Sequence, residues 1–447
     1  MLLSFRFANH RSFRDEQHLN LLPVYETRGT ETLFGREAVS VVGIFGANAS
    51  GKSNVVSALS YLSRLVGVSD RETEPGLGLK RQPFRLDPAF AAQPSSYAVD
   101  LTLGGIRHTY GFTVNDEQVL EEWLYTYPLR RKRVVFERTD QDFSWGEDSG
   151  RSALRKLAEI VAPTALFLSV AARFVRLSAG DARGDRDDIS DSLHNVYSWL
   201  YQRMSRVPPP MGSLPSISLN YSRLLANERR RAIVVDILRA ADVGLRDVSL
   251  RPPDEEELLV QISGSPEDLP PAERERIRRL SRRDPQLQFF HYGAVGDVAL
   301  DVADESSGTL RLLELAARAV SVLERGGLFV IDEVDASLHP LLTARLIRMF
   351  ELESVNNRGA QLIFTSHDAT LLGSLDGEEI LRRDQIWFTE KNDYGCSTLF
   401  PLADFKPKRA GENRQRRYLN GNYGAIPDIS MDLFEQALST RIDVDAE

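Results

Sequence analysis

The sequence is poor in the features that mark secreted or membrane-embedded proteins. It contains one cysteine, Cys396, in 447 residues, so no internal disulfide can form and a reducing compartment is expected. It contains no run of about 18 apolar residues, which argues against a membrane span. The first residues, 1–7, alternate like a strand and lack the charged and apolar regions of a secretion signal. We therefore expect a cytoplasmic protein without a membrane partner.

The sequence also lacks internal repeats, and no apolar heptad is kept over three or more repeats, so we expect no long coiled-coil arm. The net charge of −9 argues against broad electrostatic binding of nucleic acid. Two basic segments stand out, Arg-Arg-Lys-Arg at 130–133 and the stretch from Lys406 to Arg417. Each fits a solvated surface, or else a face that contacts DNA, RNA or a partner protein.

One motif points directly to a ligand. Residues 46–53 read Gly-Ala-Asn-Ala-Ser-Gly-Lys-Ser, between an apolar run at 39–45 and helix-spaced apolar residues from 53 to 66. This strand–loop–helix context is that of a phosphate-binding P-loop, in which glycines let backbone N–H groups surround the phosphates. Lys52 supplies charge for the β- and γ-phosphates, and Ser53 supplies a hydroxyl for Mg²⁺. The predicted nucleotide-binding residues here are Gly46, Asn48, Ala49, Ser50, Gly51, Lys52, Ser53 and Asn54.

A second motif lies far downstream, where the apolar run 328–331 ends in Asp332 and Glu333. Such a pair often merely ends a strand. Downstream of a P-loop it predicts a different use, in which Asp332 holds Mg²⁺ opposite Ser53. Glu333, one residue on, would orient and deprotonate the attacking water. The sequence therefore predicts an ATP hydrolase with ATP and Mg²⁺ as cofactors, in which Lys52 and Glu333 are catalytic.

Another buried strand at 361–365 is followed by Ser366 and His367. A lone histidine is more often structural. In this setting we interpret His367 as a catalytic residue that contacts the γ-phosphate.

The order of these motifs resembles that of ABC-type ATPases of the SMC/RecF class. The signature motif resembles Glu305-Ser-Ser-Gly-Thr309, the D-loop resembles 336–339, and the switch histidine is His367. More than 200 residues separate Lys52 from the signature, which is also similar to that class. The resemblance implies an α/β fold: an ABC-type P-loop ATPase head, with helices flanking a mixed sheet, an antiparallel β-subdomain and a long, mainly helical insertion.

The same resemblance implies further site residues and a partner. Ser306 and Gly308 would cap the γ-phosphate held by a second copy of the chain, so ATP would bridge a homodimer or a higher homo-oligomer. The early turn at 9–13 is similar to the class's N-terminal turn and suggests that Arg11 approaches the nucleotide. Gln82 is the candidate for the metal-side Q-loop.

Within this class, the chain is most similar to the RloA-like and overcoming-lysogenization-defect-like abortive-infection ATPases of bacteria. This resemblance implies a sensor or regulator of anti-phage defence. About 80 residues follow His367, too few for a Toprim nuclease, so a separately encoded effector is expected. The phrases that carry the resemblance lie at 84–87, 165–169, 240–245, 305–308, 383–388 and 418–427.

Three alternatives remain open. A RecF-like DNA-binding ATPase of DNA repair or maintenance is favoured by the basic segments and disfavoured by the acidic total. A transporter motor is disfavoured by the long insertion, and a non-catalytic scaffold would require Glu333 to be inert.

The chain is long enough for several subdomains. We expect an N-terminal lobe at 1–68, an antiparallel β-subdomain at 69–150, a mainly helical insertion at 151–290, a C-terminal lobe at 291–405 and a basic-then-acidic tail at 406–447.

Overall fold

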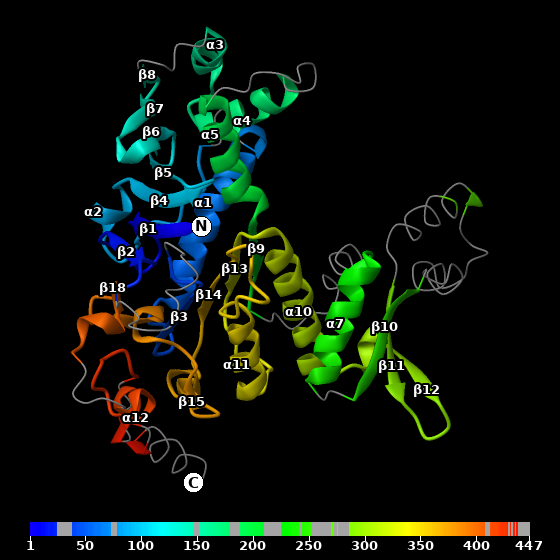
Figure 1. The fold of residues 1–447 in the computed structure, drawn as a ribbon. Helices are drawn as coiled ribbons and strands as arrows, with labels where there is room; N and C mark the ends of the chain where they lie inside the picture. Colours follow the sequence, from blue (N-terminus) through cyan, green and yellow to red (C-terminus); the bar gives the residue numbers. More distant parts are fainter. Residues whose placement is uncertain are drawn as a thin grey trace.

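The fold is that of a computed structural model. It describes residues 1–24, 38–72, 78–146, 152–178, 188–209, 225–241, 244–251, 286–406 and 412–427, with a few single positions between 270 and 436. Two large sheets with flanking helices dominate it, and a smaller sheet lies to one side with helix α7 (Figure 1). None of the described helices is long and apolar enough to cross a lipid bilayer.

The central sheet has six strands, in the order β18-β17-β3-β14-β13-β9. Five of them run parallel, and β18 pairs antiparallel to β17 at one edge. The inner strands are buried along their length, which explains why they read as continuous apolar runs. The bounds are β3 (Val41–Gly46), β9 (Met204–Val207), β13 (Leu328–Ile331), β14 (Gln361–Thr365), β17 (Ile386–Lys391) and β18 (Ser397–Pro401).

Helices cover this sheet and begin near its carboxyl edge. Helix α1 (Lys52–Glu72) directly follows the loop after β3, and it contacts β3 and β14. Helix α10 (Ser307–Arg325) packs on β13 and β9, with buried residues on nearly every side. The Ser306 hydroxyl caps α10 by accepting from Thr309 N–H at 3.0 Å. The remaining helix near this edge is α11 (Pro340–Met349).

The second sheet is antiparallel and has seven strands, in the order β2-β1-β4-β5-β6-β7-β8. It joins strands from the predicted segments 1–68 and 69–150. Gly104 and Gly105, at φ 58° and 77°, form the two-residue turn between β4 and β5, which needs two left-handed residues. The bounds are β1 (Leu2–Ala8), β2 (Gln17–Asn20), β4 (Ser95–Leu103), β5 (Ile106–Val114), β6 (Val119–Tyr127), β7 (Arg133–Thr139) and β8 (Asp142–Trp145).

One face of this sheet is apolar and packs against helices, because its residues alternate. Phe5, Val99 and Phe112 are buried in one cluster with the inner faces of α1, α4 and α5. These helices lie together on the same side of the sheet (Figure 1). The added helices are α2 (Pro88–Ala91), α3 (Ser152–Ile160), α4 (Phe167–Ser178) and α5 (Asp188–Tyr197).

The segment predicted as a mainly helical insertion holds α3, α4, α5 and α7 (Glu228–Ala240), and it also contributes strands that the sequence did not indicate. Strand β9 is only four residues long and joins the central sheet beside β13. Strands β10 (Leu245–Arg251), β11 (Gln286–Tyr292) and β12 (Asp297–Asp301) form a separate antiparallel sheet. The sequence also predicts a highly charged helix at 271–283, and nearly all of this segment lies outside the described residues.

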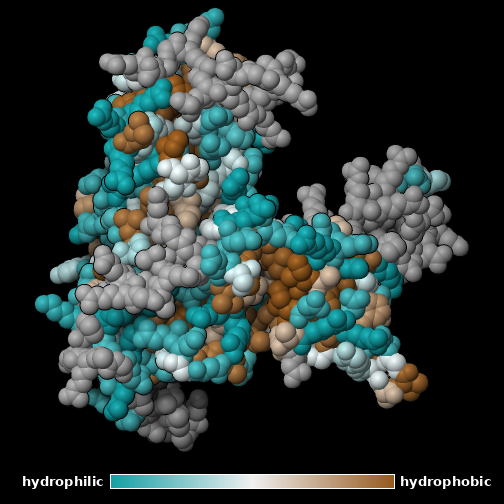
Figure 2. All heavy atoms as spheres, viewed as in Figure 1, coloured by the Kyte–Doolittle hydropathy of each residue, from teal (hydrophilic) through white to brown (hydrophobic). Residues whose placement is uncertain are grey.

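Helix α7 and the small sheet share a third apolar core with α10. Figure 2 shows apolar surface beside α10 and α7, where a hollow of about 550 Å³ is lined by residues that include Ile233, Val320, Leu323 and Met349. The smaller elements near the chain end are β15 (Ser374–Leu375), β16 (Glu378–Glu379) and α12 (Arg414–Leu419).

Candidate active site

The site lies where the carboxyl ends of three parallel strands meet. Strand β14 lies between β3, which leads into the glycine-rich loop, and β13, which leads into the two carboxylates. Loops that follow parallel strands gather at one edge of the sheet. Residues separated by hundreds of positions are therefore neighbours here.

Lys52 opens α1 and folds back over the loop. Its ammonium group donates to the carbonyl oxygens of Gly46 at 2.7 Å and Ala47 at 2.8 Å. Burial lowers the pKa of Lys52 to about 8, and the nearby carboxylates only partly oppose this, with Asp335 ahead of Glu333 and Asp332. The charge of Lys52 is thus held in a confined site, and none of the described carboxylates contacts it directly.

Asp332 is buried and forms the centre of a compact hydrogen-bond cluster. Its Oδ1 accepts from Ser53 Oγ at 2.9 Å and from Thr365 Oγ1 at 2.7 Å. The hydroxyl of Thr365 also accepts from Glu333 N–H at 2.8 Å. The last residue of β14 therefore fixes both carboxylate residues relative to the P-loop serine.

Glu333 and His367 face each other at the open side of this cluster. Glu333 Oε1 lies 3.8 Å from His367 Nε2, and about a third of each side chain is exposed. The backbone of Glu333 has φ 55°, a left-handed conformation that costs about 1 kcal/mol or more for a side chain of this kind. The Glu333 side chain is partly exposed, so a water can reach its carboxylate.

The loop itself is tied to other elements by close packing. A side chain at Gly46 would place its Cβ 2.4 Å from the carbonyl oxygen of Thr389, so only glycine fits there. Ser50 Oγ lies 2.7 Å from Thr389 Oγ1, and Ser50 O accepts from Ser397 Oγ at 2.7 Å. Asn48 and Ala49 are exposed at the tip of the loop.

Arg11 reaches the first turn of α1. Its Nη1 donates to Asn54 Oδ1 at 3.3 Å, and its Nε donates to the Gln82 side chain. Burial lowers the pKa of Arg11, as does the nearby charge of Arg206, whereas Asp332 opposes the shift. The structure thus brings Arg11 and Gln82 together beside the P-loop helix, next to a hollow of about 440 Å³.

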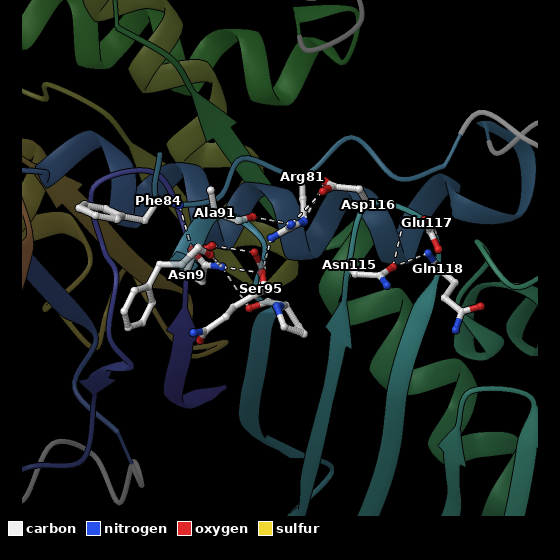
Figure 3. Close-up of polar contacts among 12 residues, drawn as sticks. Asn9, Arg81, Phe84, Ala91, Ser95, Asn115, Asp116, Glu117 and Gln118 are labelled. Carbon is white, nitrogen blue, oxygen red and sulfur yellow. Dashed lines mark hydrogen bonds and ion pairs between the residues drawn. The ribbon is translucent and has the colours of Figure 1, made fainter. Parts of the chain in front are cut away.

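A polar network around Asn9 and Arg81 lies next to the Arg11–Gln82 pair in the sequence (Figure 3). The Asn9 amide group donates to the carbonyl oxygens of Phe90 and Gln93, and its Oδ1 accepts from Phe84 N–H at 2.9 Å. Arg81, next to Gln82, is held by Asp116 at 2.8 Å and by backbone oxygens of the same segment. Asn9, two residues before Arg11, and Arg81, directly before Gln82, are therefore both anchored.

The site offers oxygen ligands that suit Mg²⁺, which typically takes one or two protein oxygens and completes its shell with water and phosphate. Ser53 Oγ and Asp332 Oδ1 fit that pattern because they already lie in contact. The described residues contain no cluster of three or more His, Cys, Asp or Glu that would suit a metal caged by protein. The Gln82 oxygen accepts from Arg11, so this bond would have to break before Gln82 could bind a metal.

The signature residues lie elsewhere on the same chain. Gly308 packs against the D-loop, and a Cβ there would lie 3.0 Å from Ser337 O. Among the described residues, no hydrogen bond joins 305–309 to the loop at 46–54. His339 caps α11 by accepting from Leu341 N–H at 3.2 Å, a role that an aspartate also performs.

Four residues of this site were not predicted from the sequence. Arg311, on the signature helix, donates to the carbonyl oxygens of Asp332 at 3.2 Å and Glu333 at 3.4 Å. It could have been found as a charged residue on the apolar face of an expected helix. The other three residues are Thr365, Asp335 and Arg206. Their contacts depend on packing between distant segments.

A P-loop after one parallel strand, two carboxylates after another and a histidine from the strand between them define a P-loop ATPase head. The model of the family described as "AAA domain, putative AbiEii toxin, Type IV TA system" matches residues 41–157 and 187–373, more than half of the chain. The chain belongs to this family, and its fold is that of a P-loop ATPase head. No curated protein matches it.

Solved structures that resemble the chain include SMC heads. The SMC head domain from Thermotoga maritima is 12% identical, covers 90% of this chain and 98% of its own, and has a TM-score of 0.39. An SMC head bound to the C-winged helix domain of ScpA is 13% identical, with coverage of 90% and 99% and a TM-score of 0.40. A head with an extended coiled coil, bound to the C-terminal domain of ScpA derived from Pyrococcus furiosus, is 11% identical, with coverage of 90% and 97% and a TM-score of 0.41.

Proposed function

We propose that the protein is a Mg²⁺-dependent ATPase whose two heads close on ATP and open after hydrolysis, and that it regulates an anti-phage defence system through a separate effector. The observation that carries the hydrolytic part is the cluster of Ser53, Asp332, Thr365 and Glu333 at the end of three parallel strands. Mg²⁺, held by Ser53 and Asp332, would neutralise charge on the phosphates. Glu333 is positioned to accept a proton from the attacking water, and His367 faces it.

The proposal of two heads rests on the placement of the signature. The N-terminal end of α10 is an anion site by its exposed N–H groups and dipole. Ser306 and Ser307 are exposed there, beside the D-loop rather than beside the chain's own P-loop. A second copy would bring its phosphates to this helix end, which supports a closed homodimer with ATP at the interface.

The defence role is supported by the family's description as a putative toxin of a type IV toxin–antitoxin system. A RecF-like role in DNA maintenance is the second candidate, because the basic turn at 130–133 is exposed on the antiparallel sheet.

Glu333→Gln tests the chemistry. It keeps the Ser53–Asp332 contact and the loop, so ATP binding should stay within about threefold of wild type, while turnover should fall at least about a hundredfold. Protection of cells from phage, measured as efficiency of plating with the genomic neighbours present, should be lost with it. Lys52→Ala is the comparison, because it should weaken binding itself. If Glu333→Gln hydrolyses ATP at the wild-type rate, Glu333 is not the general base. Full protection without turnover would separate defence from hydrolysis.

A further inference from the structure

The outer face of the antiparallel sheet carries a row of aromatic side chains that the ATPase site does not use. Along β6, Trp123, Tyr125 and Tyr127 alternate with the buried Glu122 and Leu124. The three rings therefore share the face opposite to α1 and α4. Consecutive rings are about 6.6 Å apart along the strand.

Small residues make room beside the first ring. The strand register aligns Trp123 with Gly111, then Ala98, then Arg6 on β1. A Cβ at Gly111 would lie 2.4 Å from the Trp123 ring, so the indole extends across this glycine. The Trp123 ring therefore lies over small residues, and this line of residues across the sheet ends at Arg6.

Cationic groups lie over the other two rings, so a base would stack there after Lys132 and Arg107 turn toward the phosphates. Lys132 Nζ lies 3.6 Å from the centre of the Tyr125 ring, and Arg107 Cζ lies 5.2 Å from the centre of the Tyr127 ring. A hollow of about 360 Å³ opens at this end of the sheet, lined by Leu3, Thr102, Gly105, Arg107, Tyr127 and Arg130.

The turn that follows β6 adds exposed positive charge. Leu129 and Arg130 are both left-handed, at φ 52° and 62°, and Leu129 is 96% exposed. The Leu129 side chain therefore does not contribute to the core of this fold.

The carboxylates of this face do not cancel its positive charge. Asp100 accepts a hydrogen bond from Arg107 at 3.0 Å. Glu137 accepts from the Tyr125 hydroxyl at 2.7 Å and lies 3.9 Å from Lys132. Glu121 lies at the far end and accepts from Thr113 at 3.1 Å. Within the part of the chain that the structure describes, Arg6, Arg130 and Arg131 have no carboxylate partner.

We propose that this face binds single-stranded nucleic acid, with bases stacked on Trp123, Tyr125 and Tyr127 and with phosphates held by Arg6, Arg130 and Arg131. Rings on a sheet surface together with cations are the means by which proteins bind single strands without strong sequence preference. A duplex hides the faces of its bases, so it cannot use the rings. The positive charge of the face in a chain of net charge −9 also favours a polyanion.

Fluorescence anisotropy of the full-length protein without ATP tests this binding, so its failure would leave the proposed ATPase cycle untouched. The probes are oligo-dT and oligo-rU strands of about 16 nucleotides and a duplex of the same length. Both single strands should bind within about threefold of each other, because rings and phosphates are common to them. The duplex should bind at least about tenfold more weakly.

Two variants separate stacking from charge. Trp123→Leu keeps an apolar side chain over Gly111 and should weaken single-strand binding at least about fivefold. Arg130→Glu with Arg131→Glu should weaken it further and reduce the slope of log K against log salt by about 1.4. Arg229→Glu with Arg231→Glu on α7 makes the same change in net charge and should leave binding unchanged.

Three results would overturn the proposal. One is a duplex that binds as tightly as the single strands. Another is equal loss in the α7 control, which would mean that net charge alone attracts the probe. The third is unaltered binding in both face variants when ATP turnover shows that they are folded.

Discussion

At the residue scale, a few hydroxyl groups fix the charged groups of the proposed hydrolytic site. Thr365 holds the carboxylate of Asp332 and the backbone of Glu333 with one hydroxyl. Glu333 keeps its left-handed backbone because this N–H is anchored. Lys52 is anchored differently, through two carbonyl oxygens of its own loop, and these contacts must give way to phosphate.

The pKa of Lys52 leads to a pH dependence of nucleotide binding. In the free protein, burial lowers this pKa to about 8. Phosphate favours the charged form, so the pKa in the complex is higher. Above the free-state pKa, binding must take up a proton, and affinity for ATP should fall as pH rises, by up to about tenfold per pH unit.

Calorimetry from about pH 7 to pH 9.5, in buffers of different ionisation enthalpy, measures both the affinity and the proton uptake. Lys52→Arg is the control, since a guanidinium stays charged throughout and should show a flat profile. Constant wild-type affinity over this range without proton uptake would contradict the placement of Lys52.

The sequence predicts those residues whose role follows from local order. Residues 46–53 build the loop from consecutive backbone groups, and Asp332 and Glu333 end a recognisable strand. Thr365 and Arg311 could not be assigned in this way. Their partners lie across the sheet or on another helix, and only the packing of β14 and α10 brings them together.

At the element scale, one buried charged pair joins the antiparallel sheet to α4. Glu122 on β6 accepts from the N–H groups of Phe167 at 2.6 Å and Leu168 at 2.9 Å, at the start of that helix. Burial raises the pKa of Glu122, and Arg138 partly opposes the shift. Arg138, also fully buried, lies 3.8 Å from Glu122 and donates to Ala165 O. Both ends of the turn before α4 are thus fixed to strands.

Glu122→Gln should destabilise the protein strongly. The amide can still accept from the helix N–H groups, but Arg138 loses the buried carboxylate that lies 3.8 Å from it. The free energy of unfolding should fall by about 3 kcal/mol or more, as for other broken buried pairs. Urea unfolding measures it. Glu121→Gln, the exposed neighbour on the same strand, should change stability by less than about 0.5 kcal/mol, and equal effects of the two variants would refute this account of the pair.

The elements with long periodic patterns were predictable, and the short ones were not. The spacing of apolar residues predicts a helix from Leu310 to Leu323, and α10 runs longer because Ser306 caps it and Gly326 ends it at φ 70°. Strand β9 has four residues, of which two are polar, so no period can be read from it. Its pairing with β13 makes it a strand.

At the scale of the whole molecule, α10, whose first residues belong to the predicted signature, connects the candidate active site to the small sheet. Arg311 joins α10 to the carbonyl oxygens of Asp332 and Glu333. Glu305, the first residue of the predicted signature, has a buried side chain that contacts His291 of β11. A second copy docking at Ser306 would therefore act on an element that contacts both the hydrolytic residues and the small sheet.

In the proposed cycle, ATP joins two heads through the signature end of α10, and light scattering of Glu333→Gln with and without ATP measures this assembly. Ser307→Glu in that background is the critical variant. A negative charge at this exposed first position should favour the helix itself by about 0.3 kcal/mol or more, yet repel a partner's γ-phosphate. Ser307→Gln, of similar size without charge, is the matched control.

We predict that ATP doubles the mass of the Glu333→Gln protein and of its Ser307→Gln control. Ser307→Glu should bind ATP with unchanged affinity and keep the mass of the ATP-free state. If Ser307→Glu assembles with ATP as fully as its control, the signature does not meet the partner's nucleotide, and the two-headed mechanism is contradicted.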